Sequence, residues 1–351
     1  MAKAVVLGVS GMTGRAIARE LVDAGWDVAG TGRDPEHFPA ELGASGVDFV
    51  RSDRGDAADL DAVLAGGADL VVDCVAYTAA HAQLLVERAA GLGAIVALSS
   101  KAVYVDAHGC HSNSDDPPDF GGPVVETTAT LEPDFSGEYQ SRLGYGTNKV
   151  AMEQTLLAAS CPVSILRPSR IHGPGSSRPR EWFVVRRLRD GRTRLPLAHG
   201  GRTGNHPTAA VNLARLVRVC AEQPATRVLN AADPGTPTAA DIAQAIAAAA
   251  ELPLEIVGLD EGVPDAWGRS TWDTWPPFFL DMSAAAGIGY TPVGTYAETV
   301  AATVHELRAL PPADSAAIDA DPFFTGRFDY ALDDAALAAA STPSAPPSSS
   351  R

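Results

Sequence analysis

Residues 3–14 have the sequence KAVVLGVSGMTG, in which a short apolar run leads directly into glycines at positions 8, 11 and 14. The apolar run predicts a buried β-strand, and the residues after it predict a helix that begins near Thr13. Three glycines at this spacing let the backbone turn tightly, approach a pyrophosphate and pack the helix against the strand. The N–H groups at the start of such a helix attract an anion. We therefore predict a dinucleotide-phosphate cradle that consists of Gly8, Ser10, Gly11, Met12, Thr13 and Gly14.

The first half of the chain repeats this alternation of strand and helix. Strands are predicted near 3–8, 27–31, 47–50, 69–75, 93–99 and 163–167. Helices are predicted near 13–24, 56–65, 78–91 and 144–159. This alternation is typical of a parallel sheet with helices on both faces. The predicted fold class is α/β, with a Rossmann-type doubly wound parallel sheet in a dinucleotide-binding domain over residues 1–168.

The second half of the chain is less regular. Its predicted elements are helices near 209–222, 238–250 and 295–309 and strands near 227–230 and 254–258. Residues 169–310 are expected to form mainly a smaller α/β substrate-binding part, with some segments returning to the Rossmann domain. Residues 311–351 are predicted to be a C-terminal extension, whose end, 341–351, has the Ser- and Pro-rich composition of a disordered tail.

Composition and charge exclude several classes of partner. Apolar residues make up 46% of the 351 residues, but no run approaches the roughly 20 apolar residues that cross a bilayer. A strand that begins at Lys3 leaves no place for a signal peptide, so we expect a soluble, cytoplasmic protein with no membrane partner. The net charge of −16 repels polyanions, which argues against nucleic acid. The four cysteines lie far apart, so neither a disulfide framework nor a metal site is predicted.

Positive charge is concentrated in one stretch. Between positions 170 and 202 there are nine arginines, and only Glu181 and Asp190 oppose them. This pattern predicts a local site for an anionic group of a substrate. A solvated helix face is the alternative.

The residues after the second and third predicted strands bear on the choice of cofactor. An NAD-selective site usually has an acidic residue at the end of the second strand, where this chain has Gly32 followed by Arg33. A guanidinium at this place can bind the 2′-phosphate of NADP(H), so NADP(H) is favoured, while NAD(H) stays open. The alternative is that Arg33 is a solvated residue of a turn. Asp53 is a candidate for the adenine edge, and the predicted cofactor set also includes Arg54, Ala76 and Tyr77.

Tyr145 and Lys149 are candidates for acid/base chemistry. Four residues apart, they share one face of a predicted helix. A nearby cation stabilises a phenolate, and lowering a tyrosine pKa from about 10 to about 7 requires roughly 4 kcal/mol, which one cation at about 4 Å can supply. An ordinary helix-surface pair is the alternative, although the chain contains only three lysines.

Two serines follow the fifth predicted strand. Ser99 and Ser100 stand at the carboxyl end of the sheet, where ligands bind in this architecture. Serines also occur at strand ends simply as turn formers. Together with the glycine turn and the Tyr145/Lys149 pair, this position makes Ser100 a candidate hydrogen-bond donor to a substrate oxygen.

These segments, with Leu166-Arg167-Pro168-Ser169-Arg170-Ile171-His172-Gly173-Pro174-Gly175, resemble the extended short-chain dehydrogenase/reductase family, the NAD-dependent epimerase/dehydratase group. The resemblance covers roughly residues 3–309. It implies a Rossmann fold with Tyr145 as general acid/base, Lys149 on the nicotinamide ribose and Ser100 on the reacting oxygen. It also implies cofactor contacts by Ser99, Tyr145, Lys149 and Pro168, and it allows a homodimer.

The chain departs from the family pattern at two places. Lys101-Ala102 follows the serine where dehydratases of the family have an Asp-Glu pair, so dehydration is disfavoured. The arginine and aspartate that sugar-nucleotide members have near Asn205–Asn212 are missing, which places a nucleotide-sugar substrate in doubt. We expect an oxidoreductase that transfers hydride at a secondary alcohol or ketone carbon of a polar, anionic or sugar-like small molecule, as a reductase/dehydrogenase or an epimerase. A catalytically silent NAD(P)-binding sensor is the alternative.

Two further features have more than one interpretation. The insertion at 105–122 contains His108, Cys110 and His111, but its glycine, serine and proline content favours a mobile surface loop or substrate lid over a zinc site. His172 either lines the site or belongs to a turn.

Overall fold

The computed structural model describes residues 1–341, which form two compact units. The first unit contains residues 1–177, 206–236 and 278–299, and the second contains residues 178–205, 237–277 and 300–341. Each unit therefore combines segments that lie far apart in the sequence. The domain boundaries predicted at 168 and 310 stay a prediction.

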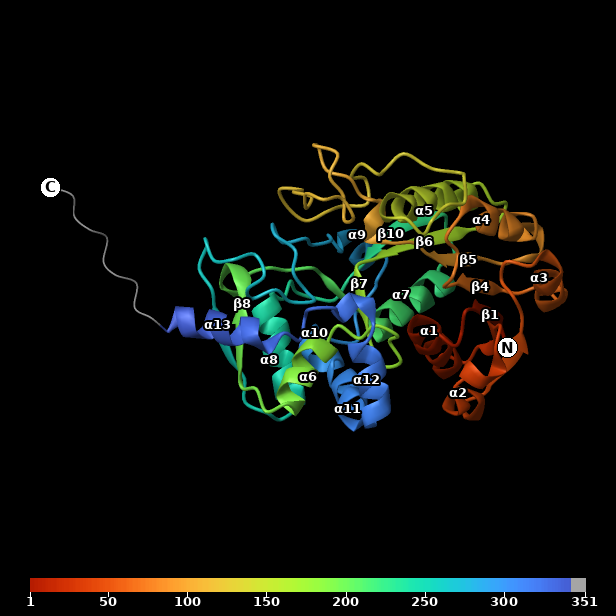
Figure 1. Ribbon diagram of the computed structural model, residues 1–351. Helices are drawn as coiled ribbons and strands as arrows, with labels where there is room; N and C mark the ends of the chain where they lie inside the picture. The colour runs from red at the N-terminus through yellow and green to blue at the C-terminus, as the bar shows by residue number, and fades with distance from the viewer. Residues whose placement is uncertain (342–351) are drawn as a thin grey trace. The chain divides into compact units, whose positions relative to one another are not determined.

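The first unit is built around a parallel sheet of seven strands in the order β10-β6-β5-β4-β1-β2-β3 (Figure 1). The strands are β1 (Lys3–Leu7), β2 (Asp27–Gly32), β3 (Val47–Arg51), β4 (Leu70–Asp73), β5 (Ile95–Leu98), β6 (Val163–Pro168) and β10 (Arg227–Ala231). The chain order reverses on either side of β1, so that β4 and β2 are its two neighbours. This is the doubly wound arrangement that the sequence predicted, and ligands in such sheets bind beyond the carboxyl ends of the strands near the reversal.

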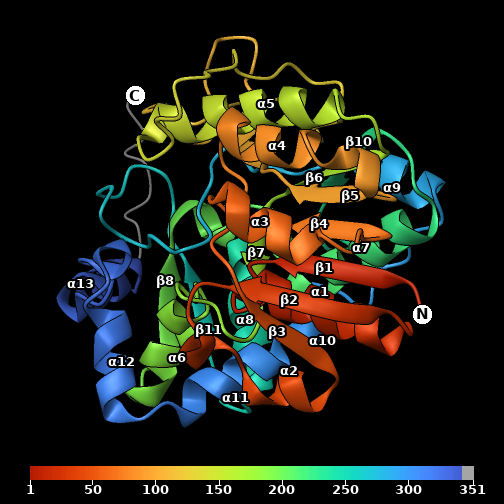
Figure 2. The same ribbon diagram turned by 90° about the vertical axis from the view of Figure 1, so that its right-hand side faces the viewer.

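Helices cover both faces of this sheet. The helices α1 (Met12–Asp23) and α7 (Ala210–Glu222) lie on one face, and α3 (Ala57–Leu64), α4 (Ala79–Val86) and α5 (Arg142–Leu157) lie on the other (Figure 2). The remaining elements of the unit are short: α2 (Ala40–Ala44), α9 (Ser283–Gly287), α10 (Tyr296–Thr299) and the strand pair β7 (Arg170–His172) and β9 (Pro207–Ala209).

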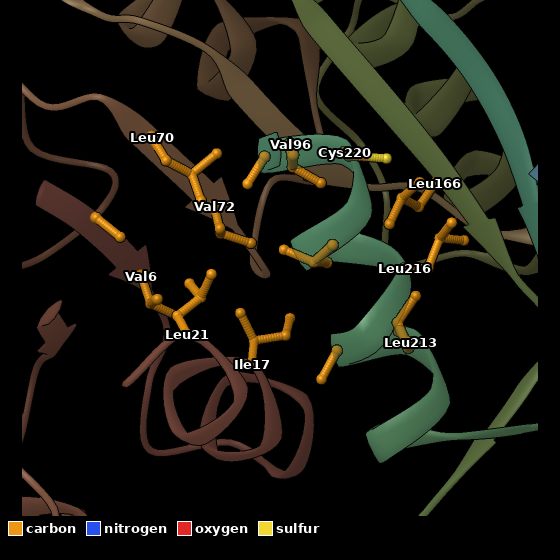
Figure 3. Close-up of a cluster of buried hydrophobic side chains, with 14 of the residues drawn as sticks. Val6, Ile17, Leu21, Leu70, Val72, Val96, Leu166, Leu213, Leu216 and Cys220 are labelled. Atoms are coloured by element: carbon orange, nitrogen blue, oxygen red, sulfur yellow. The ribbon is translucent and has the colours of Figure 1, made fainter. Parts of the chain in front are cut away.

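Alternation along each strand divides the core between the two faces. In β1, Ala4 and Val6 belong to one buried cluster, whereas Val5 and Leu7 belong to the other. Figure 3 shows the first cluster, in which side chains from the strands meet residues of α1 and α7; those labelled are Val6, Ile17, Leu21, Leu70, Val72, Val96, Leu166, Leu213, Leu216 and Cys220. Burial on both faces explains why these strands are continuous apolar runs in the sequence.

The second unit is mainly helical. It contains α6 (Trp182–Arg189), α8 (Ala239–Ala249), α11 (Ala301–Ala309), α12 (Pro312–Asp319) and α13 (Tyr330–Ala340). The strands β8 (Arg194–Leu197) and β11 (Glu255–Gly258) form a parallel pair within it.

The structure confirms the predicted fold class and corrects some element boundaries. The helix expected over 295–309 is interrupted at Val300, and its two parts, α10 and α11, belong to different units. The sequence analysis did not predict α6, α12 or α13. Apart from Ser341, the tail expected to be disordered lies outside the described residues. Within residues 1–341, no helix combines the length and the apolar composition that crossing a bilayer requires.

Candidate active site

A cavity of about 610 Å³ opens at the carboxyl ends of the strands of the first unit. The residues that follow or end β1, β2, β3 and β4 all contribute to it. Its lining consists of Gly8, Ser10, Gly11, Thr31, Gly32, Arg33, Asp34, His37, Ser52, Asp53, Arg54, Gly55, Val75, Tyr77, His81 and Tyr139. The cavity therefore lies where the predicted glycine cradle meets the ends of the second, third and fourth strands.

The glycine turn has the geometry that a phosphate cradle needs. Gly8 has a φ of +87°, in the left-handed region where a side chain is strained. A Cβ on Gly14 would lie 2.2 Å from the carbonyl oxygen of Gly8, so only glycine lets α1 begin this close to β1. The predicted roles of these two glycines, a tight turn and close packing of helix on strand, match the structure.

The start of α1 differs from the starts of α3, α4 and α5. Asp56, Thr78 and Ser141 accept hydrogen bonds from first-turn N–H groups of α3, α4 and α5. At α1 the capping residue is Gly11, which offers no side chain to those N–H groups. Met12 and Thr13 form the first turn behind it. The N–H groups of α1 are therefore available to an anion in the cavity.

Two hydroxyl groups in the cavity have no hydrogen-bond partner in the described part of the chain. The Oγ atoms of Ser10 and Ser52 are buried and make no hydrogen bond within residues 1–341. Buried hydroxyls in native proteins are nearly always paired, so these two indicate a polar ligand in the cavity. A nicotinamide dinucleotide, with its phosphates and ribose hydroxyls, fits this set of donors and acceptors.

At the end of β2 the cavity presents a positive side chain and no acceptor. Arg33 is exposed, lines the cavity, and has no hydrogen-bond or ion-pair partner in the part of the chain that the structure describes. The neighbouring carboxylate, Asp34, instead accepts from the N–H of Glu36 and pairs with His37 at 3.1 Å. Asp34 does not hold the Arg33 guanidinium away from the cavity.

Asp53 and Arg54 both line the cavity but differ in their surroundings. Asp53 is exposed, and its carboxylate accepts from the N–H of Gly55. Arg54 is buried, and its guanidinium pairs with Asp73 and donates to the carbonyl of His81. Its remaining Nη1 is buried without a partner among the described residues. Arg54 therefore anchors the cavity floor to β4, and only Nη1 is left for a ligand.

Lys149 lies beneath the site in a fixed position. Its Nζ donates to the carbonyls of Ala76, at 2.5 Å, and Leu98, at 2.8 Å, which follow or end β4 and β5. The same Nζ lies 4.6 Å from the centre of the Tyr77 ring. Burial lowers the pKa of Lys149 to about 8, and the charge of Asp73 opposes this shift. The ammonium is therefore held at the strand ends and is easier to deprotonate than an exposed lysine.

Tyr145 and Ser100 meet beside Lys149. The Tyr145 ring lies 6.2 Å from that of Tyr77, and its hydroxyl is hydrogen-bonded with the Ser100 side chain. Ser100 also caps the short helix that follows β5, because its Oγ accepts from the N–H of Ala102 at 3.1 Å. Helix α5 thus brings Tyr145 and Lys149 to the carboxyl end of β5, as their spacing predicted.

One expectation about Tyr145 is wrong. Burial raises the pKa of Tyr145, the hydrogen bond from Ser100 partly opposes this, and Tyr77 adds to the rise. The sequence analysis expected Lys149 to lower this pKa, but the Lys149 ammonium is held by two backbone carbonyls instead. In this structure Tyr145 is a neutral phenol across the physiological pH range.

Ser99 and Pro168, which were predicted to contact the cofactor, are both buried residues at strand ends. The Ser99 hydroxyl donates to Glu153, which also pairs with Arg167 at the end of β6. This side chain is buried, and its hydroxyl proton is used within the fold, so the cofactor contact of Ser99 stays a prediction. Pro168 is the buried last residue of β6.

Sequence reasoning missed Tyr139 and His81. The ring of Tyr139 stacks on that of Tyr77 with 4.8 Å between centroids and 10° between planes. The Nδ1 atom of His81 accepts from the N–H of Tyr77 at 3.2 Å, and burial and Arg54 lower the pKa of His81. Neither residue belongs to a recognisable spacing pattern, and no signal in the sequence places them at the cavity.

A protein-family model matches most of this chain. Residues 4–232 match the model of the NAD dependent epimerase/dehydratase family. The chain belongs to this family. The match confirms the family that the motifs indicated, and it supports an NAD-dependent enzyme. No curated protein sequence matches the chain.

Solved structures share the fold of this family member at low sequence identity. The Bordetella bronchiseptica enzyme WbmH in complex with NAD+ is 18% identical, with a TM-score of 0.65 over 88% of this chain and 99% of that one. A putative epimerase from Burkholderia cenocepacia is 22% identical, with a TM-score of 0.66 over 88% and 99%. The Bacillus cereus UDP-glucuronic acid 4-epimerase with UDP-glucuronic acid and NAD is 17% identical, with a TM-score of 0.63 over 88% and 100%. At these identities the similarity establishes the fold alone.

The prediction of an anion site at the arginine cluster between positions 170 and 202 is wrong for most of its nine arginines. Five of the nine arginines are in ion pairs: Arg178 with Asp321, Arg186 with Asp190 and Asp319, Arg187 with Asp333, Arg192 with Asp334, and Arg194 with Glu255. Arg189 donates to the hydroxyl of Ser315 at 2.8 Å. Most of these partners belong to the C-terminal extension. The arginines of α6 therefore bind the C-terminal extension and do not form a site for a substrate anion.

The insertion and His172 have structural surroundings in the first unit. The carboxylate of Asp106 accepts from the N–H groups of His108, Cys110 and Asp119, which gives the insertion a defined turn. Among residues 1–341 no three His, Cys, Asp or Glu side chains are placed to hold a metal ion. His172 is buried, with its Nε2 2.8 Å from the carboxylate of Asp233. His172 is therefore a buried residue paired with Asp233, whereas the sequence suggested either a turn residue or a residue that lines the site.

Proposed function

We propose that this protein is an oxidoreductase that transfers hydride between a nicotinamide dinucleotide and a secondary alcohol or ketone carbon of a polar, sugar-like small molecule. It would act as a reductase/dehydrogenase or as an epimerase. The observation that carries the proposal is that Ser100, Tyr145 and Lys149 lie together beside the cavity at the glycine cradle.

The three side chains divide the chemistry between them. A bound nicotinamide would supply or accept the hydride. In reduction, Tyr145, which burial keeps protonated, would give its proton to the substrate oxygen and become a phenolate. In oxidation, the phenolate form of Tyr145 would take the proton of the substrate hydroxyl. Ser100 would donate a hydrogen bond to the same oxygen, because its hydroxyl already meets that of Tyr145. Lys149 would hold the nicotinamide ribose with the donor that remains after Ala76 and Leu98 are bound.

The preferred cofactor in this proposal is NADP(H). Gly32 provides no carboxylate for a ribose diol, whereas Arg33 lines the cavity without a partner among residues 1–341. A Cβ on Gly32 would lie 3.1 Å from the Ser10 hydroxyl, which has no partner among the described residues, and Ser10 and Arg33 both line the cavity. A 2′-phosphate there would receive one neutral and one charge-assisted hydrogen bond. The family name and the solved structures with NAD support NAD(H) as the general cofactor class, and the preference for the phosphorylated form is the finer proposal.

A sugar-like substrate is proposed from the family and from the Bacillus cereus epimerase, which was crystallised with UDP-glucuronic acid. The paired arginines of α6 give no support to a strongly anionic substrate. Homodimeric assembly and a cytoplasmic location stay predictions.

Mass spectrometry of small molecules released from the purified protein tests the proposal. Tightly retained oxidised dinucleotide would favour an epimerase, which regenerates its cofactor in every cycle. An empty protein that binds added NADPH would favour a reductase. A protein that neither retains nor binds any nicotinamide dinucleotide would contradict the proposed function.

A further inference from the structure

The second unit has a cavity of its own, of about 270 Å³, between segment 266–269 and residues 325–333. Its charged and polar lining consists of Arg187, Arg269, Thr325, Arg327, Asp329 and Asp333. All of these residues except Arg187 lie beyond residue 232, where the match to the family model ends. The dinucleotide cavity, by contrast, is lined only by residues of the first unit. The second cavity is therefore a separate feature of this chain.

The two carboxylates of this cavity already have partners. Asp333 accepts from Arg187 at 2.9 Å, and both side chains are buried. Asp329 caps α13 by accepting from the N–H of Ala331 at 3.2 Å. The Arg187 guanidinium also donates to the carbonyls of Phe183 and Arg327, so its donors are committed to the fold.

Two arginines remain, opposed by the charge of Asp329, which no ion pair within residues 1–341 neutralises. Arg327 is held in place because it donates to the carbonyls of Phe323, at 2.9 Å, and Ser270, at 3.1 Å, and neither of these acceptors carries a charge. Arg269 is exposed and has no ion-pair or hydrogen-bond partner within residues 1–341. Burial and the nearby charge of Arg269 lower the pKa of Arg327, while Asp273 opposes this shift. Two guanidinium groups thus repel each other at one cavity of a protein whose net charge is −16.

We propose that this cavity binds the phosphate group of a small molecule through Arg269 and Arg327. A phosphate monoester presents three strong acceptor oxygens, so it can accept hydrogen bonds from both guanidinium groups at once, whereas a single carboxylate has two oxygens. Guanidinium forks match the spacing of phosphate oxygens. Thr325 adds a hydroxyl donor at the same cavity. The volume exceeds that of one water, about 30 Å³, several times over, so it accommodates a phosphate with a small organic group.

Calorimetric titration of inorganic phosphate into the full-length protein tests this site, with ionic strength held constant by chloride. The matched variants are Arg269→Ala and Arg202→Ala, because both arginines are exposed, belong to the second unit and have no partner among the described residues. Neither substitution removes a contact of the fold. We expect saturable binding by the wild type, a loss of affinity of about tenfold or more in Arg269→Ala, and no change in Arg202→Ala.

The first unit also has a phosphate cradle, so each titration is repeated with excess NADPH. Binding at the proposed site persists when dinucleotide is present, whereas phosphate displaced by NADPH belongs to the first unit. Succinate is titrated in the same way. If succinate binds as tightly as phosphate, the cavity is a general anion site and the proposed preference for phosphate is wrong. Absence of saturable binding, equal affinity in Arg269→Ala, or complete displacement by NADPH would overturn the proposal. None of these outcomes depends on whether the protein turns over a substrate.

Discussion

Arginines in the two units have opposite surroundings. Arg33 lines the dinucleotide cavity of the first unit and has no partner within the described residues, although Asp34 is its neighbour in sequence. Arg186 and Arg187 of α6 are paired with Asp319 and Asp333, which lie well over a hundred positions away along the chain. The arginine with an acidic neighbour is available to a ligand, and the densest arginine cluster is mostly neutralised.

This difference shows that local charge density does not identify a binding site. A guanidinium binds a ligand only when the fold leaves it without a carboxylate, and that depends on which distant segment packs against it. In the second unit the acidic C-terminal extension packs against α6, so its arginines contribute to stability. In the first unit, Asp34 caps its own short helix, and Arg33 has no partner within residues 1–341.

The largest expected effect concerns the chemistry beside the cavity. Tyr145→Phe keeps the ring but removes the transferable proton, so turnover should fall on the order of 10²–10⁴-fold while cofactor affinity stays nearly unchanged. Steady-state kinetics and cofactor titration measure the two quantities. Tyr104→Phe is the matched control, because it removes another buried hydroxyl, which donates to Asn230 at 2.7 Å. Turnover of Tyr145→Phe within a few-fold of wild type would remove Tyr145 from the mechanism.

The paired arginines make a stability prediction. Arg187→Ala leaves the buried Asp333 carboxylate without its partner, so the free energy of unfolding should fall by about 3–5 kcal/mol. Arg33→Ala removes an exposed side chain and should change it by no more than about 0.5 kcal/mol. Denaturant unfolding of both variants gives the comparison. Equal stability of the two variants would show that the ion pairs of α6 are not needed for the fold.

Ser100→Ala tests the hydrogen bond to the reacting oxygen. If Ser100 stabilises developing charge on that oxygen, its loss should reduce kcat by about 10²–10³-fold. The variant also loses the cap at Ala102, so a thermal melt checks that the protein remains folded. A folded variant with an unchanged rate would leave Ser100 a structural residue only.

The pH dependence follows from Lys149. Its folded-state pKa of about 8 lies below its ordinary value of 10.5, so the charged form persists only below about pH 8. As pH rises above 8, loss of this charge should lower kcat/KM about tenfold per pH unit, the slope of a single deprotonation. The same shift means that the folded state loses this proton first, so the contribution of Lys149 to stability should increase between about pH 8 and 10.5. A kcat/KM that stays flat up to pH 10 would contradict the assignment.

Local spacing explains what the sequence could predict. The glycines of the cradle lie within seven residues, and Tyr145 and Lys149 share one helix face, so one strand, one turn and one helix are enough to place them. The partner of Arg187 lies 146 residues away, and no periodicity connects α6 with α13. Tyr139 and His81 line the same cavity as Gly8 and Arg33, which lie far from them in the sequence, and short-range patterns do not encode such proximity.

The pKa of Tyr145 was missed for a different reason. Spacing indicates that Tyr145 and Lys149 are close, but it does not show where the ammonium donates its hydrogen bonds. The carbonyls of Ala76 and Leu98 take two of them, and these acceptors come from strands that the helix sequence does not specify.

The central claim is that an arginine without an ion-pair partner among the described residues binds the ligand, whereas a paired arginine does not. The most direct test is to titrate NADP(H) and NAD(H) into the wild type, Arg33→Ala and Arg186→Ala. The wild type should bind NADP(H) more tightly than NAD(H). Arg33→Ala should lose about 1.5–3 kcal/mol of NADP(H) affinity, the range for hydrogen bonds to charged groups, and keep its NAD(H) affinity. Arg186→Ala, which breaks pairs with Asp190 and Asp319, should bind both cofactors as the wild type does. Wild-type NAD(H) binding as tight as or tighter than NADP(H) binding would contradict the account and make Arg33 a solvated turn residue.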